Sequence, residues 1–201
     1  MCGIAGFMGP DVVSASARDA LERMIHPLAH RGPDGFGYHA APSIGLAHAR
    51  LSIIDLSTGD QPIHNPRRTV WTVFNGEIFN FVELRQMLEA KGHHFYTHSD
   101  TEVIVHLYDR YGEDFVQHLN GQFAIALWDS ERQRLVLARD RAGIRPLYYT
   151  RQPGRLWVAS EVKSLLAVLP ECAHLESQAL LQTLTYWAPV DPETLYQGVQ
   201  S

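Results

Sequence analysis

The 201-residue sequence contains only two cysteines, Cys2 and Cys172, which is too few for a disulfide framework. Basic residues are also scarce, since 17 lysines and arginines stand against 22 acidic residues and give a formal net charge of −5. A general nucleic-acid binder needs a basic surface to neutralise phosphates, so we expect no nucleic-acid partner. The low cysteine content favours a reducing compartment, and we expect a cytoplasmic protein.

The sequence has no apolar run of the roughly 20 residues that a membrane-spanning helix needs, so we expect no membrane partner. The apolar N-terminus has no basic flank and soon meets Pro10 and Asp11, which argues against a signal peptide. No Ser-Gly-Gly stretch and no Walker-type glycine loop is present. The eleven histidines show no spacing with a third ligand that is typical of a metal site, so none is expected.

Hydrophobic residues make up 45% of the chain, which is enough for one well-buried core. Alternating apolar and β-branched patterns predict strands at residues 4–8, 36–41, 44–54, 69–74, 122–129, 134–139, 146–150 and 155–159. Helical periodicity and capping patterns predict helices at residues 16–25, 80–92, 99–112, 161–169 and 177–184. Because strands and helices occur in separate groups, the sequence predicts an α+β fold with mainly antiparallel sheets.

Residues 2–185 are predicted to form one domain. The remaining segment, residues 186–201, contains Pro189, Pro192 and Gly198 and has no strong periodicity. It is therefore predicted to be a linker toward a further domain.

Cys2 directly follows the initiator methionine, which is normally removed before a residue as small as cysteine. Removal would leave Cys2 with a free α-amine beside its own thiol. The reference pKa values are about 7.7–8.0 for the amine and about 8.5 for the thiol, so one residue could supply both nucleophile and base. The alternative is that Cys2 is only a small buried hydrophobe in the first strand.

Asn75 and Gly76 stand between two apolar runs. Asn-Gly is a strong signal for a tight turn, so a turn is expected here. An asparagine amide and a glycine backbone N–H are also the donors that stabilise the oxyanion of an amide hydrolase. The sequence leaves both interpretations open, and they are compatible.

Arg50 and Asp100 are candidates for binding the two charges of an α-amino acid. An arginine in a strand can hold a carboxylate with two hydrogen bonds, although outward-facing arginines are more frequent. Asp100 stands at a predicted helix start, where it could bind an ammonium group or simply favour the helix dipole. Together with Cys2, Asn75 and Gly76, these residues are what an enzyme acting on an α-amino-acid carboxamide needs.

The chain resembles the class II glutamine amidotransferase domain of asparagine synthetase, within the N-terminal-nucleophile hydrolases. The resemblance covers essentially the whole chain and rests on segments in one order: residues 1–6 (MCGIAG), 30–35 (HRGPDG), 48–55 (HARLSIID), 59–62 (GDQP), 74–80 (FNGEIFN), 99–103 (SDTEV), 121–124 (GQFA), 139–149 (RDRAGIRPLYY) and 160–163 (SEVK).

This resemblance implies a four-layer αββα sandwich and a set of roles. Cys2 would attack the glutamine amide and form a γ-glutamyl thioester, with its α-amine moving the protons. Asn75 and Gly76 would hold the oxyanion. The resemblance assigns the glutamine α-carboxylate and its surroundings to Arg50, Leu51 and Ile53, and the α-ammonium to Glu77 and Asp100. Asp140 and Arg145 would support the site or face the synthetase half, and no catalytic role is expected of them.

The resemblance also implies partners. L-glutamine would be the substrate, and a C-terminal synthetase domain, in cis or as a separate subunit, would use ATP and Mg to amidate aspartate. No cofactor is expected for this domain, and a homodimer is compatible with the resemblance. Two alternatives stay open: a glutaminase half serving another carboxylate acceptor, and a catalytically silent docking or regulatory module.

Overall fold

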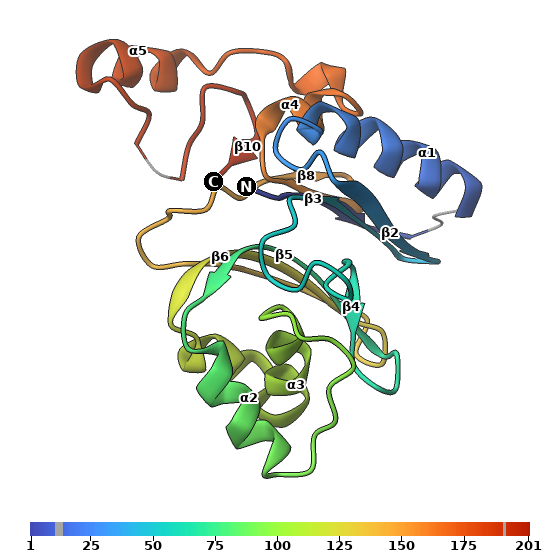
Figure 1. Cartoon of the computed structure of the whole chain (residues 1–201). Helices are drawn as coiled ribbons and strands as arrows, with labels where there is room; N and C mark the ends of the chain where they lie inside the picture. Colours follow the sequence, from blue (N-terminus) through green and yellow to red (C-terminus); the bar gives the residue numbers. More distant parts are fainter. Residues whose placement is uncertain (11–13, 191) are drawn as a thin grey trace.

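The computed structural model describes residues 1–10, 14–190 and 192–201. Two β-sheets stack face to face, and helices cover the outer face of each (Figure 1). The strand order is β10-β8-β9-β1-β3-β2 in the first sheet and β4-β5-β6-β7 in the second, and every pairing is antiparallel. The expected α+β fold with four αββα layers is thereby confirmed.

The first sheet consists of β1 (Gly3–Met8), β2 (Gly35–Ala41), β3 (Ile44–Arg50), β8 (Tyr148–Gln152), β9 (Arg155–Ala159) and β10 (Val199–Gln200). The second consists of β4 (Ile63–His64), β5 (Val70–Ile78), β6 (Gly121–Asp129) and β7 (Arg134–Arg139). The helices are α1 (Ser14–Ile25), α2 (Phe81–Glu89), α3 (Glu102–Tyr111), α4 (Val162–Leu166) and α5 (Ser177–Tyr186). Short 3-10 helices lie at η1 (His26–Leu28), η2 (Gly112–His118) and η3 (Pro170–Cys172).

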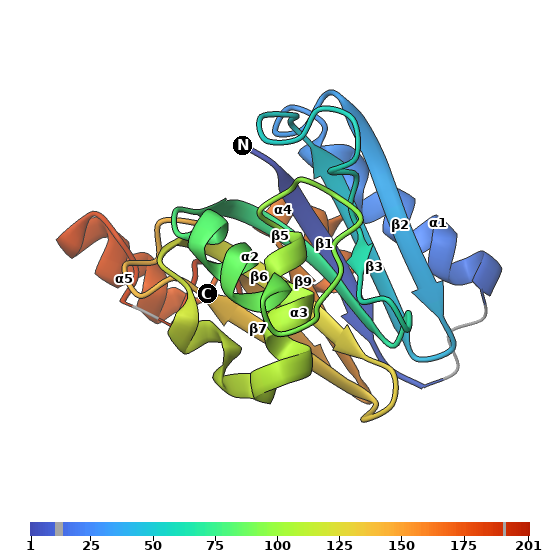
Figure 2. The ribbon, with the colours of Figure 1, turned by 60° about the horizontal axis from the view of Figure 1, so that its bottom comes forward.

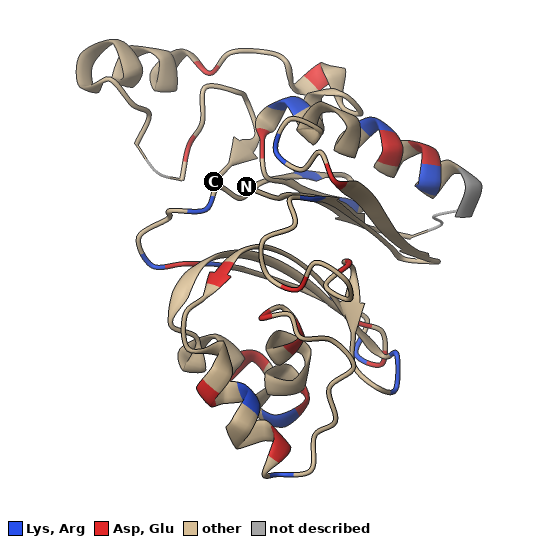
Figure 3. Ribbon diagram, in the orientation of Figure 1, with Lys and Arg blue, Asp and Glu red and all other residues tan. Residues whose placement is uncertain are grey.

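The sandwich arises because successive side chains of a strand point to opposite faces. In β1, Ile4 packs between the two sheets, whereas Ala5 and Phe7 pack under the helical layer of α1. On the far side, α2 and α3 bury their apolar faces on the second sheet, as Figure 2 shows. Charged residues lie mainly on the outer helices and loops, although α5 carries none (Figure 3). The core therefore has three apolar layers, and the central strands β1, β3 and β6 are buried on both faces.

Two sequence predictions are wrong near the centre of the molecule. The strand expected at 44–54 ends at Arg50, because residues 51–54 leave the sheet and Ser52 N donates to Asp34 Oδ2 at 2.7 Å. No tight turn forms at Asn75-Gly76, since β5 runs straight through both residues, paired with β6. A Cβ at Gly76 would lie 2.1 Å from Gln122 O, so close approach of two strands, and not a turn, accounts for this glycine.

The C-terminal segment contributes to the fold more than a linker would. Val199 and Gln200 form β10 at the edge of the first sheet, paired with Thr150 and Tyr149 of β8. Val199 is 2% exposed and belongs to the core beneath α1. The folded unit thus extends past the boundary expected at residue 185. Among the described residues, no helix combines the length and hydropathy required to cross a membrane.

Candidate active site

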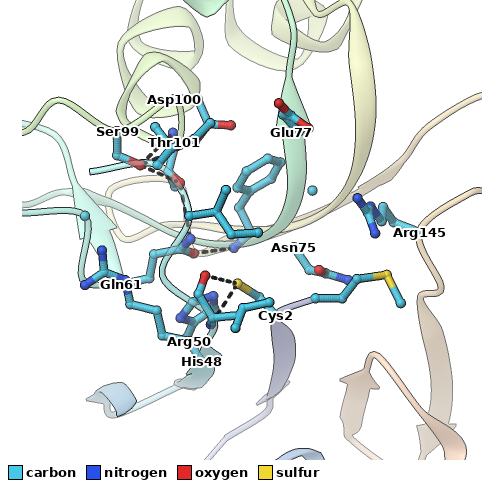
Figure 4. Close-up of a pocket in the computed structure, with 17 residues that line it drawn as sticks. Cys2, His48, Arg50, Gln61, Asn75, Glu77, Ser99, Asp100, Thr101 and Arg145 are labelled. Carbon is cyan, nitrogen blue, oxygen red and sulfur yellow. Dashed lines mark hydrogen bonds between the residues drawn. The ribbon is translucent and has the colours of Figure 1, made fainter. Parts of the chain in front are cut away.

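One pocket gathers all the residues that were expected to be catalytic or to bind substrate. It opens where β1 begins, β3 ends, and β5 passes the start of α3 (Figure 4). Its lining includes Cys2, Arg50, Leu51, Ile53, Asn75, Gly76, Glu77 and Asp100. Residues from four separate stretches of the sequence therefore meet in one place.

Antiparallel pairing of β1 with β3 places Cys2 in the pocket. Gly3 pairs with Ala49, so the residue before β1 lies beside the end of β3. The Cys2 Sγ accepts a hydrogen bond from Leu51 N at 3.4 Å and lies 3.5 Å from Leu51 O. On the opposite side, Arg31 Nε donates to Cys2 O at 2.9 Å. Leu51 thus contacts the thiol at the pocket wall, and Arg31 holds the backbone of Cys2.

Burial raises the pKa of the Cys2 thiol, whereas the Leu51 N–H and the positive charges of the N-terminus and Arg50 lower it. Raising dominates, so the thiol is predominantly protonated near neutral pH and needs a base to act as a nucleophile. Met1 also lines the pocket and is 55% exposed. While Met1 is present, the backbone nitrogen of Cys2 is part of the Met1–Cys2 peptide bond and is not a free amine.

The open edge of β5 presents a backbone donor. Phe74 N donates to Gln61 Oε1 at 2.6 Å and Ile78 N donates to Asp100 Oδ2 at 3.0 Å, both away from β6. Because N–H groups alternate between strand edges with a period of two residues, the N–H of Gly76 points to the same edge. The Gly76 N–H therefore faces the pocket. It lies between the Phe74 N–H, which is bonded to Gln61, and the Ile78 N–H, which is bonded to Asp100.

A second donor lies next to it in sequence. Asn75 is 1% exposed, and its Nδ2 has no hydrogen-bond partner among the described residues. A buried donor without an acceptor costs about 1–3 kcal/mol. Asn75 Nδ2 and the Gly76 N–H together can donate to an anionic oxygen in the pocket.

Arg50 lines the side of the pocket shown at the lower left of Figure 4. Its guanidinium is nearly buried and donates to Asp60 Oδ1 and to Asp55 O. Asp60 is largely exposed, with 82% of its side-chain surface accessible, so this ion pair is solvent-screened. A carboxylate that entered the pocket could compete for the same guanidinium.

Two carboxylates face the pocket above β5. Asp100 is 4% exposed, and burial raises its pKa to about 6 despite hydrogen bonds from Ile78 N and Ser99 Oγ. The nearby negative charge of Glu77 adds to this rise. Glu77 itself is exposed. The pair forms an acidic region that suits a cationic group.

The lining also includes His48, Gln61 and Arg145, none of which was expected to be catalytic or to bind substrate. For Arg145 the resemblance implied support of the site or contact with the synthetase half. Burial lowers the pKa of His48 to about 3, so its ring is neutral. The amide of Gln61 connects β5 to Thr101 at the start of α3, through its hydrogen bond to Thr101 Oγ1 at 3.2 Å. Gln61 and His48 stand inside the family-like segments, which was the only sequence signal for them. In the described part of the chain, no group of three His, Cys, Asp or Glu residues is arranged to hold a metal ion.

Comparison with protein families identifies a match over residues 1–201 to the model described as a glutamine amidotransferase domain. Asparagine synthetase [glutamine-hydrolyzing] 1 of Bacillus subtilis is 40% identical over 197 residues, covering 97% of this chain and 31% of that protein. The glutamine-hydrolyzing asparagine synthetase of Zea mays is 45% identical over 166 residues, covering 82% of this chain and 28% of that protein. The chain thus spans about a third of the length of these curated relatives.

One further curated protein and one solved structure are also similar to this chain. A Penicillium rubens protein named amidase chyE is 43% identical over 212 residues, covering 99% of this chain and 30% of that protein. Among solved structures, the glutamine phosphoribosylpyrophosphate amidotransferase of B. subtilis has a TM-score of 0.68 at 25% identity. That match covers 83% of this chain and 43% of the solved one.

Proposed function

Because the chain belongs to the glutamine amidotransferase domain family, we propose that it hydrolyses the side-chain amide of L-glutamine with Cys2 as its nucleophile. The observation that carries this proposal is the convergence of the Cys2 thiol, the unpaired Asn75 amide and the Gly76 N–H on one pocket. A nucleophile opposite two free donors is the minimum arrangement for acyl transfer through a tetrahedral intermediate.

The proposed reaction begins after removal of Met1, which frees the α-amine of Cys2. The amine takes the thiol proton, and Sγ attacks the glutamine amide carbon. Asn75 and Gly76 donate to the oxygen that becomes negative. The intermediate then collapses to a γ-glutamyl thioester as the amine passes a proton to the departing ammonia. Water cleaves the thioester and releases glutamate.

The rest of the pocket matches an α-amino acid. Arg50 can exchange the exposed Asp60 for the substrate α-carboxylate, which would enter a more enclosed site. Asp100 and Glu77 provide negative charge for the α-ammonium. Leu51 and Ile53 line the space between these charged ends. These contacts favour L-glutamine over a simple carboxamide.

We propose that the ammonia serves a synthetase domain that amidates aspartate with ATP and Mg, and that the glutaminase domain itself needs no cofactor. The lengths of the asparagine synthetase relatives support this partner, since about two thirds of each lies outside the match. The alternative is a glutaminase half that serves another carboxylate acceptor, since the relatives also include proteins named amidase and not asparagine synthetase.

Glutamate release from L-glutamine tests the hydrolysis directly. The purified protein should hydrolyse L-glutamine and lose the activity in Cys2→Ala, with little turnover of D-glutamine or of an amide lacking the α-carboxylate. No glutamate from L-glutamine, by a protein whose Met1 has been removed, would favour a silent docking module instead. Equal turnover of the simple amide would contradict the assignment of Arg50.

A further inference from the structure

Eight buried side-chain nitrogen and oxygen atoms have no hydrogen-bond partner in the described part of the molecule, and four of them belong to three residues that line the Cys2 pocket: His48, Asn75 and Arg145. The His48 ring is neutral, because burial lowers its pKa to about 3. Asn75 Nδ2 is used by the proposed mechanism, whereas Arg145 Nε, which belongs to a charged group, is not. Each unpaired donor costs about 1–3 kcal/mol in the folded protein. A donor left unpaired beside a pocket is free to bond to an acceptor that a ligand brings there.

The loop between β7 and β8 holds the backbone of Arg145 firmly. Asp140 Oδ2 accepts a hydrogen bond from Arg145 N at 3.1 Å, and Asp140 Oδ1 accepts one from Ile144 N at 2.9 Å. From the other side, Arg139 Nε donates to Arg145 O at 2.9 Å and Arg139 Nη2 donates to Gly143 O at 2.7 Å. This support fixes the direction in which the Arg145 side chain leaves the loop.

Among the described residues, Arg145 forms no ion pair with an Asp or Glu side chain. Arg50, in contrast, is paired with Asp60. Figure 4 shows Arg50 and Arg145 on opposite sides of Cys2, with Asn75 between Cys2 and Arg145. The pocket thus has one cation suited to the substrate carboxylate and a second on the side of the Asn75 amide.

We propose that Arg145 is a further catalytic residue, whose guanidinium binds the oxyanion of the tetrahedral intermediate together with Asn75 and Gly76. The inference rests on the proposed glutamine hydrolysis. When Cys2 Sγ bonds to the amide carbon, the carbonyl π electrons move to oxygen and create a full negative charge. A charged donor stabilises this oxygen more than a neutral amide does, and more strongly in the intermediate than in the substrate.

The experiment compares Arg145→Met and Arg145→Lys with Arg141→Met. Arg141 is exposed on the same loop and does not line the pocket, so it controls for loss of a loop arginine. The readouts are kcat and KM for L-glutamine, the melting temperature, and the rate at which iodoacetamide alkylates Cys2. Alkylation by iodoacetamide forms no oxyanion, so it reports on the thiol alone.

Arg145→Met should lower kcat by about 10²-fold, the scale expected for loss of an oxyanion donor, with KM within about threefold of its original value. Arg145→Lys should recover part of kcat, while alkylation and melting temperature stay unchanged. An unchanged kcat, a change confined to KM, or a parallel fall in the alkylation rate would overturn the inference. Lack of glutamine hydrolysis by the unaltered protein would instead contradict the proposed function.

Discussion

Cys2, Asn75 and Arg50 come from three different strands or strand ends, yet each was identified from its own short sequence segment. Their chemistry was predictable because nucleophile, amide donor and guanidinium each have a restricted use. Arg145 was expected to support the site or face the synthetase half, and its place in the pocket lining was not predictable because the direction of its side chain depends on the contacts of Asp140 and Arg139. Roles follow from residue type, whereas placement follows from tertiary contacts.

Asn75→Ala should leave the protein folded and remove one donor to the oxyanion. Since that donor acts mainly in the transition state, kcat for glutamine should fall about 10²–10³-fold with a small change in KM. Steady-state glutamate release measures both constants. A variant that loses affinity but keeps kcat would show that Asn75 binds the ground state instead.

Arg50→Ala should change KM more than kcat, which is the reverse of the effect expected for Asn75→Ala. Its guanidinium is assigned to the substrate carboxylate in ground state and transition state alike, so KM for glutamine should rise by about tenfold or more while kcat changes less. Asp60→Asn is the matched comparison, because it removes the competing carboxylate and leaves Arg50 in place. An unchanged KM in Arg50→Ala would remove this residue from the substrate site.

Asp100 should make glutamine binding depend on pH. Its pKa of about 6 means that the carboxylate is lost below pH 6, so kcat/KM should fall by up to tenfold per pH unit there. Asp100→Asn should abolish this dependence. A profile that stays flat down to pH 4.5 in the unaltered protein would contradict the role of Asp100.

The same raised pKa sets the sign of the stability effect. Folding favours the protonated form of Asp100. The stability that this preference contributes to the folded protein is therefore present at low pH and is lost as pH rises through about 6. Asp100→Asn should therefore raise the melting temperature more at pH 8 than at pH 5. Thermal unfolding at the two pH values provides the measurement.

At the scale of elements, most strands and helices follow the predicted ranges, and the errors have local causes. The Asn75-Gly76 signal is typical of turns, but β6 continues beside it and keeps β5 extended. Asn80 directly precedes α2, yet its side chain donates to His118 O and accepts from Asn120 N instead of capping the helix. Short-range signals fail where a distant segment offers a stronger partner.

Gly76→Ala tests why β5 carries a glycine at this point. A Cβ there would lie 2.1 Å from Gln122 O and 2.8 Å from Phe123 Cα, so β6 must move and the variant should lose about 1–3 kcal/mol of stability. Gly35→Ala in β2 is the control, since a Cβ there meets nothing within 4 Å. Equal melting temperatures for the two variants would show that β6 moves freely.

At the scale of the whole molecule, the layers were predictable only through the family resemblance. Composition and periodicity indicate an α+β class, but the strand order β10-β8-β9-β1-β3-β2 joins segments from both ends of the chain. Such pairings depend on long-range contacts that local patterns do not encode. The two-residue strand β10 has too little periodicity to be found in a sequence, which is why its segment resembled a linker.

Val199→Ser tests whether the C-terminal segment belongs to the folded unit. Val199 is 2% exposed, so replacing it should cost roughly 1–3 kcal/mol and lower the melting temperature. Val190→Ser is the matched control, because Val190 is 54% exposed and should tolerate the change. If both variants melt like the unaltered protein, residues 186–201 behave as a linker.

The most direct test of the central claim is the intact mass of the purified protein before and after 6-diazo-5-oxo-L-norleucine, an electrophilic glutamine analogue. Met1 should be absent, and one adduct should form, which Cys2→Ala abolishes and excess L-glutamine slows. A retained Met1, no adduct, or an adduct that persists in Cys2→Ala would contradict the claim that Cys2 is the glutamine-directed nucleophile.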